Sequence, residues 1–199
     1  MDATVQAQIV NQRRFAQATV REFAAAVRAG DHERCAGTFE ALGRVAYGWR
    51  RAMRAVANAP APDDFRLRFL KLWVENGDDL RSEVSDDLVL IKALWSLLPR
   101  YIGPAPLTLY RGDTLWNRRR RTYGLAWTTE LEIAHAYARG LCRSSQGGSV
   151  LLKTTASAQA IISAPAQGED RYGEQEYLLD RRRLERVEVI ERFTQVAPG

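Results

Sequence analysis

The sequence predicts an α+β protein in which a helical N-terminal region precedes a compact, strand-rich domain. In the first half of the chain, apolar side chains recur at spacings of three and four, which is typical of amphipathic helices. Beyond Gly103-Pro104-Ala105-Pro106, short apolar stretches alternate with turn residues, a pattern typical of strands. We therefore expect two regions, a helical one over residues 1–102 and a strand-rich one over residues 103–199.

Four helices are expected in the first region. The clearest apolar seam runs from Phe39 to Val56. It ends before Ala59-Pro60-Ala61-Pro62, because proline has no amide hydrogen and restricts the residue before it. Asn76-Gly77-Asp78-Asp79 is expected to end the third helix. The expected helices cover residues 5–29, 39–56, 63–75 and 86–101.

The second region is expected to hold several strands and one helix. The helix covers residues 130–141 and follows the second strand. Thr129 can cap its N-terminus, with Glu132 completing a capping box. The expected strands cover residues 107–111, 125–128, 149–155, 160–163, 174–179 and 184–193.

The charge of the chain gives a weak indication of a polyanionic partner. The 199 residues carry a formal net charge of +5, and the basic residues are almost all arginine. The run Arg118-Arg119-Arg120-Arg121 could attract the phosphates of a nucleic acid, although such a run is more often a solvated loop. This run alone supports nucleic acid as a partner only weakly.

Composition favours a protein of a reducing, cytoplasmic compartment. No segment has the ~18 uninterrupted apolar residues of a membrane span, and residues 1–6 lack the pattern of a signal peptide. Cys35 and Cys142 are too few for a disulfide framework and have no metal-site spacing, so we expect no metal and no membrane partner. A protein delivered into a target cell by a specialised secretion route would have the same features.

Three short motifs in the second region carry residues of chemical interest. Leu109-Tyr110-Arg111-Gly112 ends a strand with an arginine that can grip a phosphate and a glycine that lets a ligand approach the backbone. Gly124-Leu125-Ala126-Trp127-Thr128-Thr129 is a strand that ends in hydroxyls and continues into a helix. The third motif is Glu174-Gln175-Glu176, on a late strand.

The third motif places two carboxylates on one face of a strand. Side chains alternate between faces, so Glu174 and Glu176 point the same way, roughly 6.6 Å apart along the chain. Paired carboxylates serve glycosyl-bond chemistry, in which one stabilises a positively charged sugar and the other handles a proton. They are also typical of a solvated strand face whose acids pair with arginines, and the stretch alone favours this second interpretation.

Taken in this order, the motifs resemble the arginine–serine–glutamate group of mono-ADP-ribosyltransferases, the family of the binary bacterial toxins and the vertebrate ecto-enzymes. The resemblance covers residues 106–193 and implies an ADP-ribosyltransferase-like fold for the domain 103–199, with NAD as its substrate. In that family the arginine contacts the diphosphate of NAD, which matches Arg111. The next backbone position holds the nicotinamide amide, which matches Gly112.

The resemblance also assigns the remaining site residues. The serine–threonine–serine strand that shapes the NAD pocket matches Trp127-Thr128-Thr129. Trp127 offers no hydroxyl, and alternation lets only one of Thr128 and Thr129 face the pocket. The glutamate that contacts the nicotinamide ribose matches Glu176. The earlier glutamate, typical of members that modify arginine, matches Glu174, and the aromatic residue that recognises the acceptor matches Tyr172.

The expected function is therefore transfer of ADP-ribose from NAD to a protein acceptor, arginine being the expected side chain, by a bacterial or phage toxin or effector. Two alternatives stay open: an NAD glycohydrolase of the same fold, and a non-catalytic binding module that keeps the fold. His135 has no partner at metal-ligand spacing and is more typical of a packed or surface histidine. Trp127 is more typical of packing beneath the site than of stacking on nicotinamide.

Overall fold

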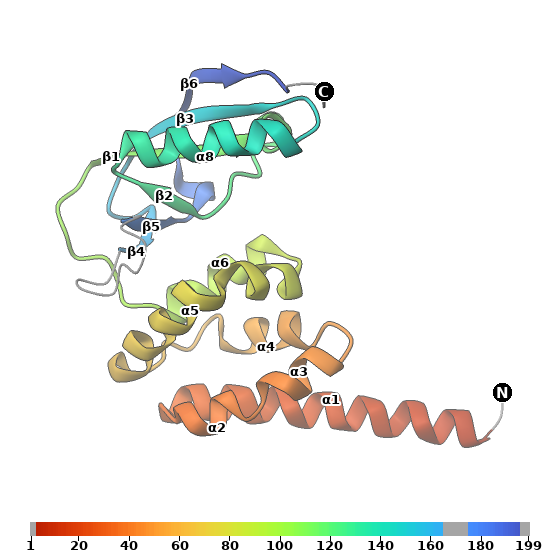
Figure 1. Cartoon of the computed structure of the whole chain (residues 1–199). Helices are drawn as coiled ribbons and strands as arrows, with labels where there is room; N and C mark the ends of the chain where they lie inside the picture. Colours follow the sequence, from red (N-terminus) through yellow and green to blue (C-terminus); the bar gives the residue numbers. More distant parts are fainter. Residues whose placement is uncertain (1–2, 165–174, 196–199) are drawn as a thin grey trace. The chain divides into compact units, whose positions relative to one another are not determined.

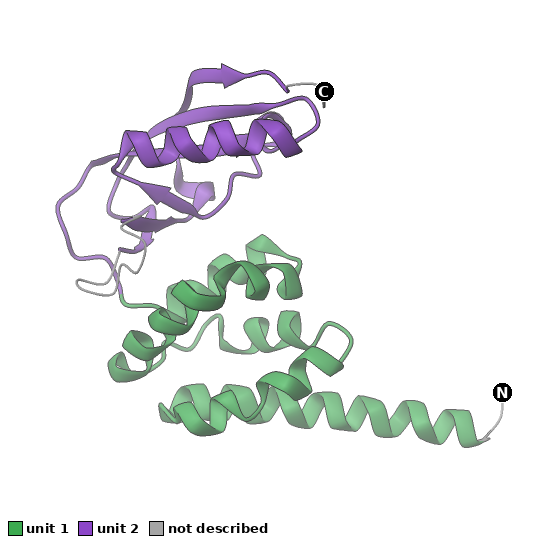
Figure 2. Ribbon diagram, viewed as in Figure 1, with its two compact units in different colours: residues 1–99 green, residues 100–199 purple. Residues whose placement is uncertain are grey.

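The computed structural model describes residues 3–164 and 175–195, and it divides the chain into two compact units. The first unit covers Met1–Pro99 and the second covers Arg100–Gly199 (Figure 2). This division lies close to the expected boundary between residues 102 and 103. The expected combination of a helical N-terminal region with strands in the second half is present (Figure 1).

Helices form the first unit, and their apolar faces meet in a core that includes Phe23, Leu42, Met53, Phe65 and Leu94. The helices are α1 (Ala3–Ala29), α2 (His32–Ala36), α3 (Phe39–Arg44), α4 (Gly48–Val56), α5 (Asp63–Val84) and α6 (Asp87–Leu97). Within the described residues, no helix is both long enough and apolar enough to cross a lipid bilayer.

One expected helix of this unit is interrupted, and one expected helix end is present as a break inside a longer helix. The single helix expected over residues 39–56 is interrupted at Tyr47, which has a left-handed φ of 58°. Gly48 then passes so close to the preceding helix that a Cβ there would lie 2.1 Å from the Leu42 carbonyl oxygen. The helix expected to end at residue 75 does break at Asn76, whose φ of −134° and ψ of 16° are not helical, and a second helical segment that was not expected follows it within α5 to Val84.

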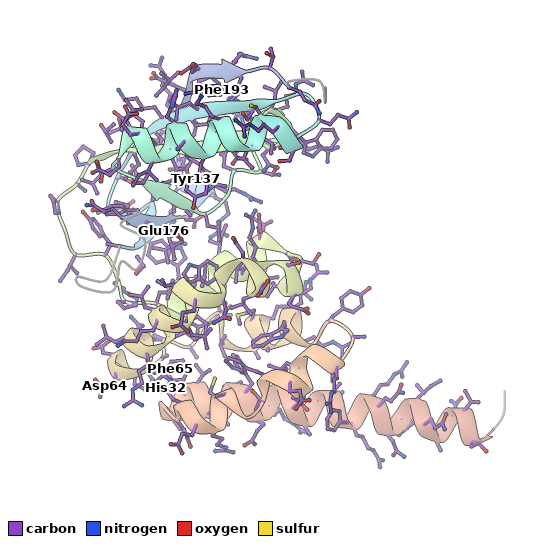
Figure 3. The ribbon with its side chains drawn as sticks, in the orientation of Figure 1. His32, Asp64, Phe65, Tyr137, Glu176 and Phe193 are labelled. Atoms are coloured by element: carbon purple, nitrogen blue, oxygen red, sulfur yellow. The ribbon has the colours of Figure 1, made fainter. Side chains whose placement is uncertain are left out.

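His32, on the short helix α2, packs against α5. Its ring stacks on Phe65 with a centroid distance of 4.2 Å, and Figure 3 shows the two side chains next to each other. Burial, together with the charge of Arg68, lowers the pKa of His32. We therefore assign this histidine to packing of the helical unit, in its neutral form at neutral pH.

A six-stranded antiparallel sheet forms the second unit, in the order β4-β5-β2-β1-β3-β6. The strands are β1 (Leu107–Thr114), β2 (Ala126–Thr128), β3 (Ser149–Ala156), β4 (Ile161–Ser163), β5 (Glu176–Leu179) and β6 (Val187–Phe193). Sequence analysis located all six, with boundaries shifted by a few residues.

Helix α8 (Leu131–Ser144) covers one face of this sheet (Figure 1). Its Ala134 and Ala138 pack on Leu151 and Tyr110, so we call this the α8 face. The opposite face carries the larger core, to which Leu109, Trp127, Leu152, Ile161 and Leu179 contribute. We call it the core face.

Three local features of the second unit differ from the prediction or were not predicted. Thr129 is not the cap of α8, since Glu130 occupies that position and its N–H donates to the Thr128 hydroxyl at 3.0 Å. The arginine run lies mainly in a short helix, α7 (Leu115–Arg120), and not in a loop. A 3₁₀ turn over Arg181–Arg183 follows β5.

Candidate functional site

The three motifs meet on neighbouring strands. The strand register pairs Tyr110 of β1 with Thr128 of β2, and Thr128 in turn with Glu176 of β5. Directly paired residues of antiparallel strands point to the same face of a sheet. Tyr110, Thr128 and Glu176 therefore form one row across three strands, on the α8 face.

Within this row, Thr128 and Glu176 are close neighbours. The Leu179 N–H donates to the Leu125 carbonyl oxygen at 2.8 Å, which makes that pair a hydrogen-bonded one. Hydrogen-bonded and non-hydrogen-bonded pairs alternate along antiparallel strands, so Thr128 and Glu176 form a non-hydrogen-bonded pair. In such pairs the side chains come closest together. Glu176 is half-buried and Thr128 is buried.

The two threonines of the second motif differ in position. Thr128 lies in the row beside Glu176, and its hydroxyl oxygen accepts the Glu130 N–H. Thr129 lies one residue beyond the strand, and its hydroxyl donates to Gln175 Oε1 at 3.2 Å. The hydroxyl next to Glu176 is therefore that of Thr128, which answers the question that alternation alone left open.

Trp127 belongs to the core face. Its side chain is 2% exposed, it makes an edge-on contact with Tyr123 at 6.3 Å, and its Nε1 donates to the Gly124 carbonyl oxygen at 3.2 Å. The ring is thus directed away from the face that carries Glu176. Its burial supports a packing role and leaves no surface for stacking on nicotinamide.

Arg111 also belongs to the core face, because it follows Tyr110 in the same strand. Its Nη1 donates to the Ala126 carbonyl oxygen at 2.6 Å. Ala126 and Leu178 form another non-hydrogen-bonded pair, so this carbonyl is directed toward β1. Strands β1 and β2 pair only at Tyr110 and Thr128, and the guanidinium therefore satisfies a carbonyl that the diverging strands leave without a ladder partner.

Asp113 holds Arg111 in this position. The carboxylate is 1% exposed and accepts hydrogen bonds from Arg111 Nε (2.8 Å), Asn117 Nδ2 (2.7 Å) and the backbone N–H groups of Thr114 (2.7 Å) and Gly124 (3.1 Å). Burial acts to raise the pKa of Asp113, but Arg111 and these donors outweigh it, and the pKa lies below the ordinary value. The sequence pattern does not single out Asp113, although alternation places it on the same strand face as Arg111.

Two glycines make room for this arrangement. A Cβ at Gly112 would lie 2.4 Å from the Ala138 backbone nitrogen, so this glycine lets α8 approach β1. A Cβ at Gly124 would lie 1.9 Å from Arg111 Nη2, so this glycine makes room for the guanidinium. Gly112 thus has a packing role in addition to the nicotinamide contact that the resemblance implies.

Two further side chains, those of His135 and Tyr137, lie on α8. His135 contacts Glu191 (Nε2–Oε2 3.3 Å) and packs edge-on against Phe193 at 5.4 Å, as a structural histidine does. Tyr137, on the same helix, is about half exposed (Figure 3). Glu174 and Tyr172 lie outside the described residues.

The cysteines show no sign of reactivity. Burial raises the pKa of the Cys35 thiol to about 12, and Cys142 is also buried. In residues 3–164 and 175–195, no group of three His, Cys, Asp or Glu side chains is arranged to hold a metal ion.

Comparisons with protein-family models, with curated proteins and with solved structures find no match to this chain.

Proposed function

We propose that the second unit is an NAD-dependent mono-ADP-ribosyltransferase, which cleaves the bond between nicotinamide and ribose and transfers ADP-ribose to a protein acceptor. The observation that carries the proposal is the row formed by Tyr110, Thr128 and Glu176. These residues come from three motifs that lie far apart in the sequence and follow the order found in that family. In the fold they are neighbours on three adjacent strands.

The chemistry of the row suits cleavage of NAD. Departure of neutral nicotinamide leaves an oxocarbenium-like ribose cation, and the leaving group needs no proton. To speed this cleavage, the protein must place a fixed negative charge beside the developing cation. Glu176 would supply that charge from a half-buried position, where electrostatic interactions are stronger than in water. Thr128, beside it in a non-hydrogen-bonded pair, would help to fix its orientation.

Arg111, which the resemblance matches to the diphosphate contact, lies on the core face, opposite Glu176. Its Nε and Nη1 already donate to Asp113 and Ala126, and its side chain remains 20% exposed. A diphosphate would have to reach its Nη2, which lies against Gly124. Since Asp113 and Ala126 fix the guanidinium beforehand, it would bind NAD without a large loss of side-chain entropy.

The remaining roles follow the resemblance. Glu174 would accept the proton of the attacking nucleophile, and Tyr172 would contact the acceptor, for which an arginine side chain is the expected group. The same resemblance suggests a toxin or effector of bacterial or phage origin.

Glu176→Gln tests the proposal directly. We expect this variant to lose about 10²–10³-fold in the rate of nicotinamide release, as other enzymes do when one preorganised stabilising group is removed. The substrate is NAD, with cell lysate or an arginine mimic as acceptor. Glu188→Gln is the matched control, because Glu188 lies on a strand of the same sheet, is half exposed and pairs with Arg186. This control should keep the wild-type rate.

The outcomes separate the alternatives. Transfer of labelled ADP-ribose to a lysate protein supports the transferase, whereas release of nicotinamide without labelling identifies an NAD glycohydrolase. Absence of release under all these conditions contradicts an enzymatic function and leaves a binding module. Release that Glu176→Gln does not alter would show that the site has been assigned to the wrong residues.

A further inference from the structure

Two arginine runs that are far apart in the sequence meet at one tyrosine. Arg118 Nη1 lies 3.3 Å from the Tyr123 hydroxyl, and Arg181 Nη1 donates to the Tyr123 carbonyl oxygen at 3.0 Å. Both runs therefore reach Tyr123, one at its hydroxyl and one at its backbone, on the side of the sheet away from α8, where Tyr123 packs into the core face. We call this group the arginine surface; it consists of Arg118, Arg119, Arg120, Arg121, Arg181, Arg182 and Arg183.

The arginine surface is strongly positive. Asp180 is fully buried and accepts from Arg182 at 2.6 Å, with Arg183 at 3.5 Å, so one carboxylate offsets part of the charge of the second run. In the part of the chain that the structure describes, no carboxylate lies within ion-pair distance of Arg118–Arg121. Such a concentration of charge attracts polyanions and repels other cations.

An exposed aromatic side chain lies within the first run. Trp116, on α7, is 57% exposed, and the guanidinium carbon of Arg120 lies 4.0 Å from the centre of its ring. Arginine over indole is a favourable cation–π arrangement, and the exposed part of the ring can contact a planar group. Aromatic rings among arginines are characteristic of proteins that bind single-stranded nucleic acid, since bases stack on the rings while the arginines contact phosphates.

Helix α7 is held firmly, so the surface exists before any ligand binds. The Thr114 hydroxyl accepts the Asn117 N–H at the start of the helix, and Asn117 Nδ2 donates to Asp113. The Thr122 N–H donates to the Asn117 carbonyl oxygen just after the helix ends. Preorganised side chains lose less entropy on binding.

We propose that the arginine surface binds single-stranded nucleic acid, with guanidinium groups on the phosphates and a base stacked on Trp116. Guanidinium groups match phosphate oxygens through paired hydrogen bonds, and the exposed indole supplies the contact that charge alone does not. An acidic protein segment would use the charges but not the indole. This proposal does not depend on NAD chemistry, and its test needs no NAD.

The test measures fluorescence anisotropy of a labelled single strand of about 20 nucleotides, at salt concentrations from about 50 to 200 mM. The charge variant is Arg119→Gln with Arg120→Gln, which spares Arg118 and Arg181, the two arginines that contact Tyr123. The matched control is Arg139→Gln with Arg143→Gln, which removes two exposed charges from α8 on the opposite face. A second variant, Trp116→Leu, removes the ring and keeps an apolar side chain.

We expect the wild-type protein to bind and its affinity to fall as salt rises. The charge variant should bind at least about fivefold more weakly, and its logarithmic salt slope should be shallower by about 1.4, or about 0.7 for each lost phosphate contact. Trp116→Leu should weaken binding about fivefold with an unchanged salt slope. The control should lose less than about twofold, since its arginines lie on the other face.

Three results would overturn the proposal. The first is no binding at the lowest salt concentration. The second is an equal loss in the α8 control, which would mean that overall charge governs binding. The third is competition by inorganic polyphosphate as effective as that of the oligonucleotide, together with no effect of Trp116→Leu, which would identify a general anion site.

Discussion

Each face of the sheet formed by strands β1, β2 and β5 carries a carboxylate, and the two carboxylates differ in burial and in hydrogen bonding. On the α8 face, Glu176 is half-buried beside Thr128. On the core face, Asp113 is 1% exposed and accepts four hydrogen bonds, one of them from Arg111. Tyr110 and Arg111 are neighbours in the chain, yet strand alternation assigns them to different faces.

This comparison separates two uses of a carboxylate. The hydrogen bonds that the Asp113 carboxylate accepts come from groups of the protein itself. It neutralises Arg111, whose guanidinium in turn donates to the Ala126 carbonyl oxygen, so the role of Asp113 is structural. Glu176 borders the surface and, in the proposed function, would use its charge on a bound ligand. Neighbouring residues of β1 thus serve different faces: Tyr110 lies in the row with Glu176, whereas Arg111 and Asp113 belong to the core face.

The largest expected difference between the faces is in stability. Asp113→Asn should lower the free energy of unfolding by roughly 3–5 kcal/mol, because it leaves the partly buried Arg111 without its counter-charge. Glu176→Gln should change it by less than about 1 kcal/mol, as expected for a half-exposed group. Urea denaturation of both variants measures the difference. Equal losses in the two would remove the distinction between a structural and a ligand-binding carboxylate.

A smaller difference is expected between the two glycines that border Arg111. Gly112→Ala should destabilise by about 1–3 kcal/mol, because the new methyl group meets the backbone of α8, which cannot give way easily. Gly124→Ala should destabilise at least as much, because the new methyl group displaces the Arg111 guanidinium from Asp113 and from the Ala126 carbonyl.

The same pair of variants separates packing from ligand binding. If the Arg111 guanidinium binds the diphosphate, its displacement by Gly124→Ala should raise KM for NAD several-fold while kcat changes little. Gly112→Ala measures how far a general loss of packing alters the same constants. An unchanged KM in Gly124→Ala would argue that Arg111 serves the protein alone.

Most of this fold could be predicted from the pattern of apolar residues. The strands were located because alternation and turn residues are local signals, and α1, α6 and α8 were located by helical spacing. The break at Tyr47 was missed, because the apolar spacing continues through it and the decisive contact is not local. The break at Asn76 was predicted, but the helical segment beyond it, which buries Leu80 and Val84 in the core, was not.

The candidate site was less predictable than the fold. The motifs could be found, but their register depends on hydrogen bonds between residues such as Leu125 and Leu179, which no local pattern encodes. Without the register, Arg111 and Glu176 could not be assigned to different faces. The role of Asp113 could not be predicted for a related reason. It depends on hydrogen bonds from Asn117 and from the Gly124 N–H, which form only in the folded chain.

The smallest expected effect is a pH dependence of stability that comes from Asp113, on the core face. The pKa of Asp113 is lower in the folded protein than its ordinary value of about 3.9. A group of this kind stabilises the folded state fully above its unfolded pKa, and that contribution disappears as pH falls through the lower, folded pKa. The difference in unfolding free energy between wild type and Asp113→Asn should therefore be constant from pH 7 to about pH 5 and should shrink only below about pH 4.

Denaturation of both proteins across this pH range isolates the contribution of Asp113, because all other carboxylates are common to the two proteins. A difference that instead grows as pH falls from 7 to 5 would mean that burial outweighs Arg111 and raises the pKa, and Asp113 would then not be the permanent counter-ion of the core face.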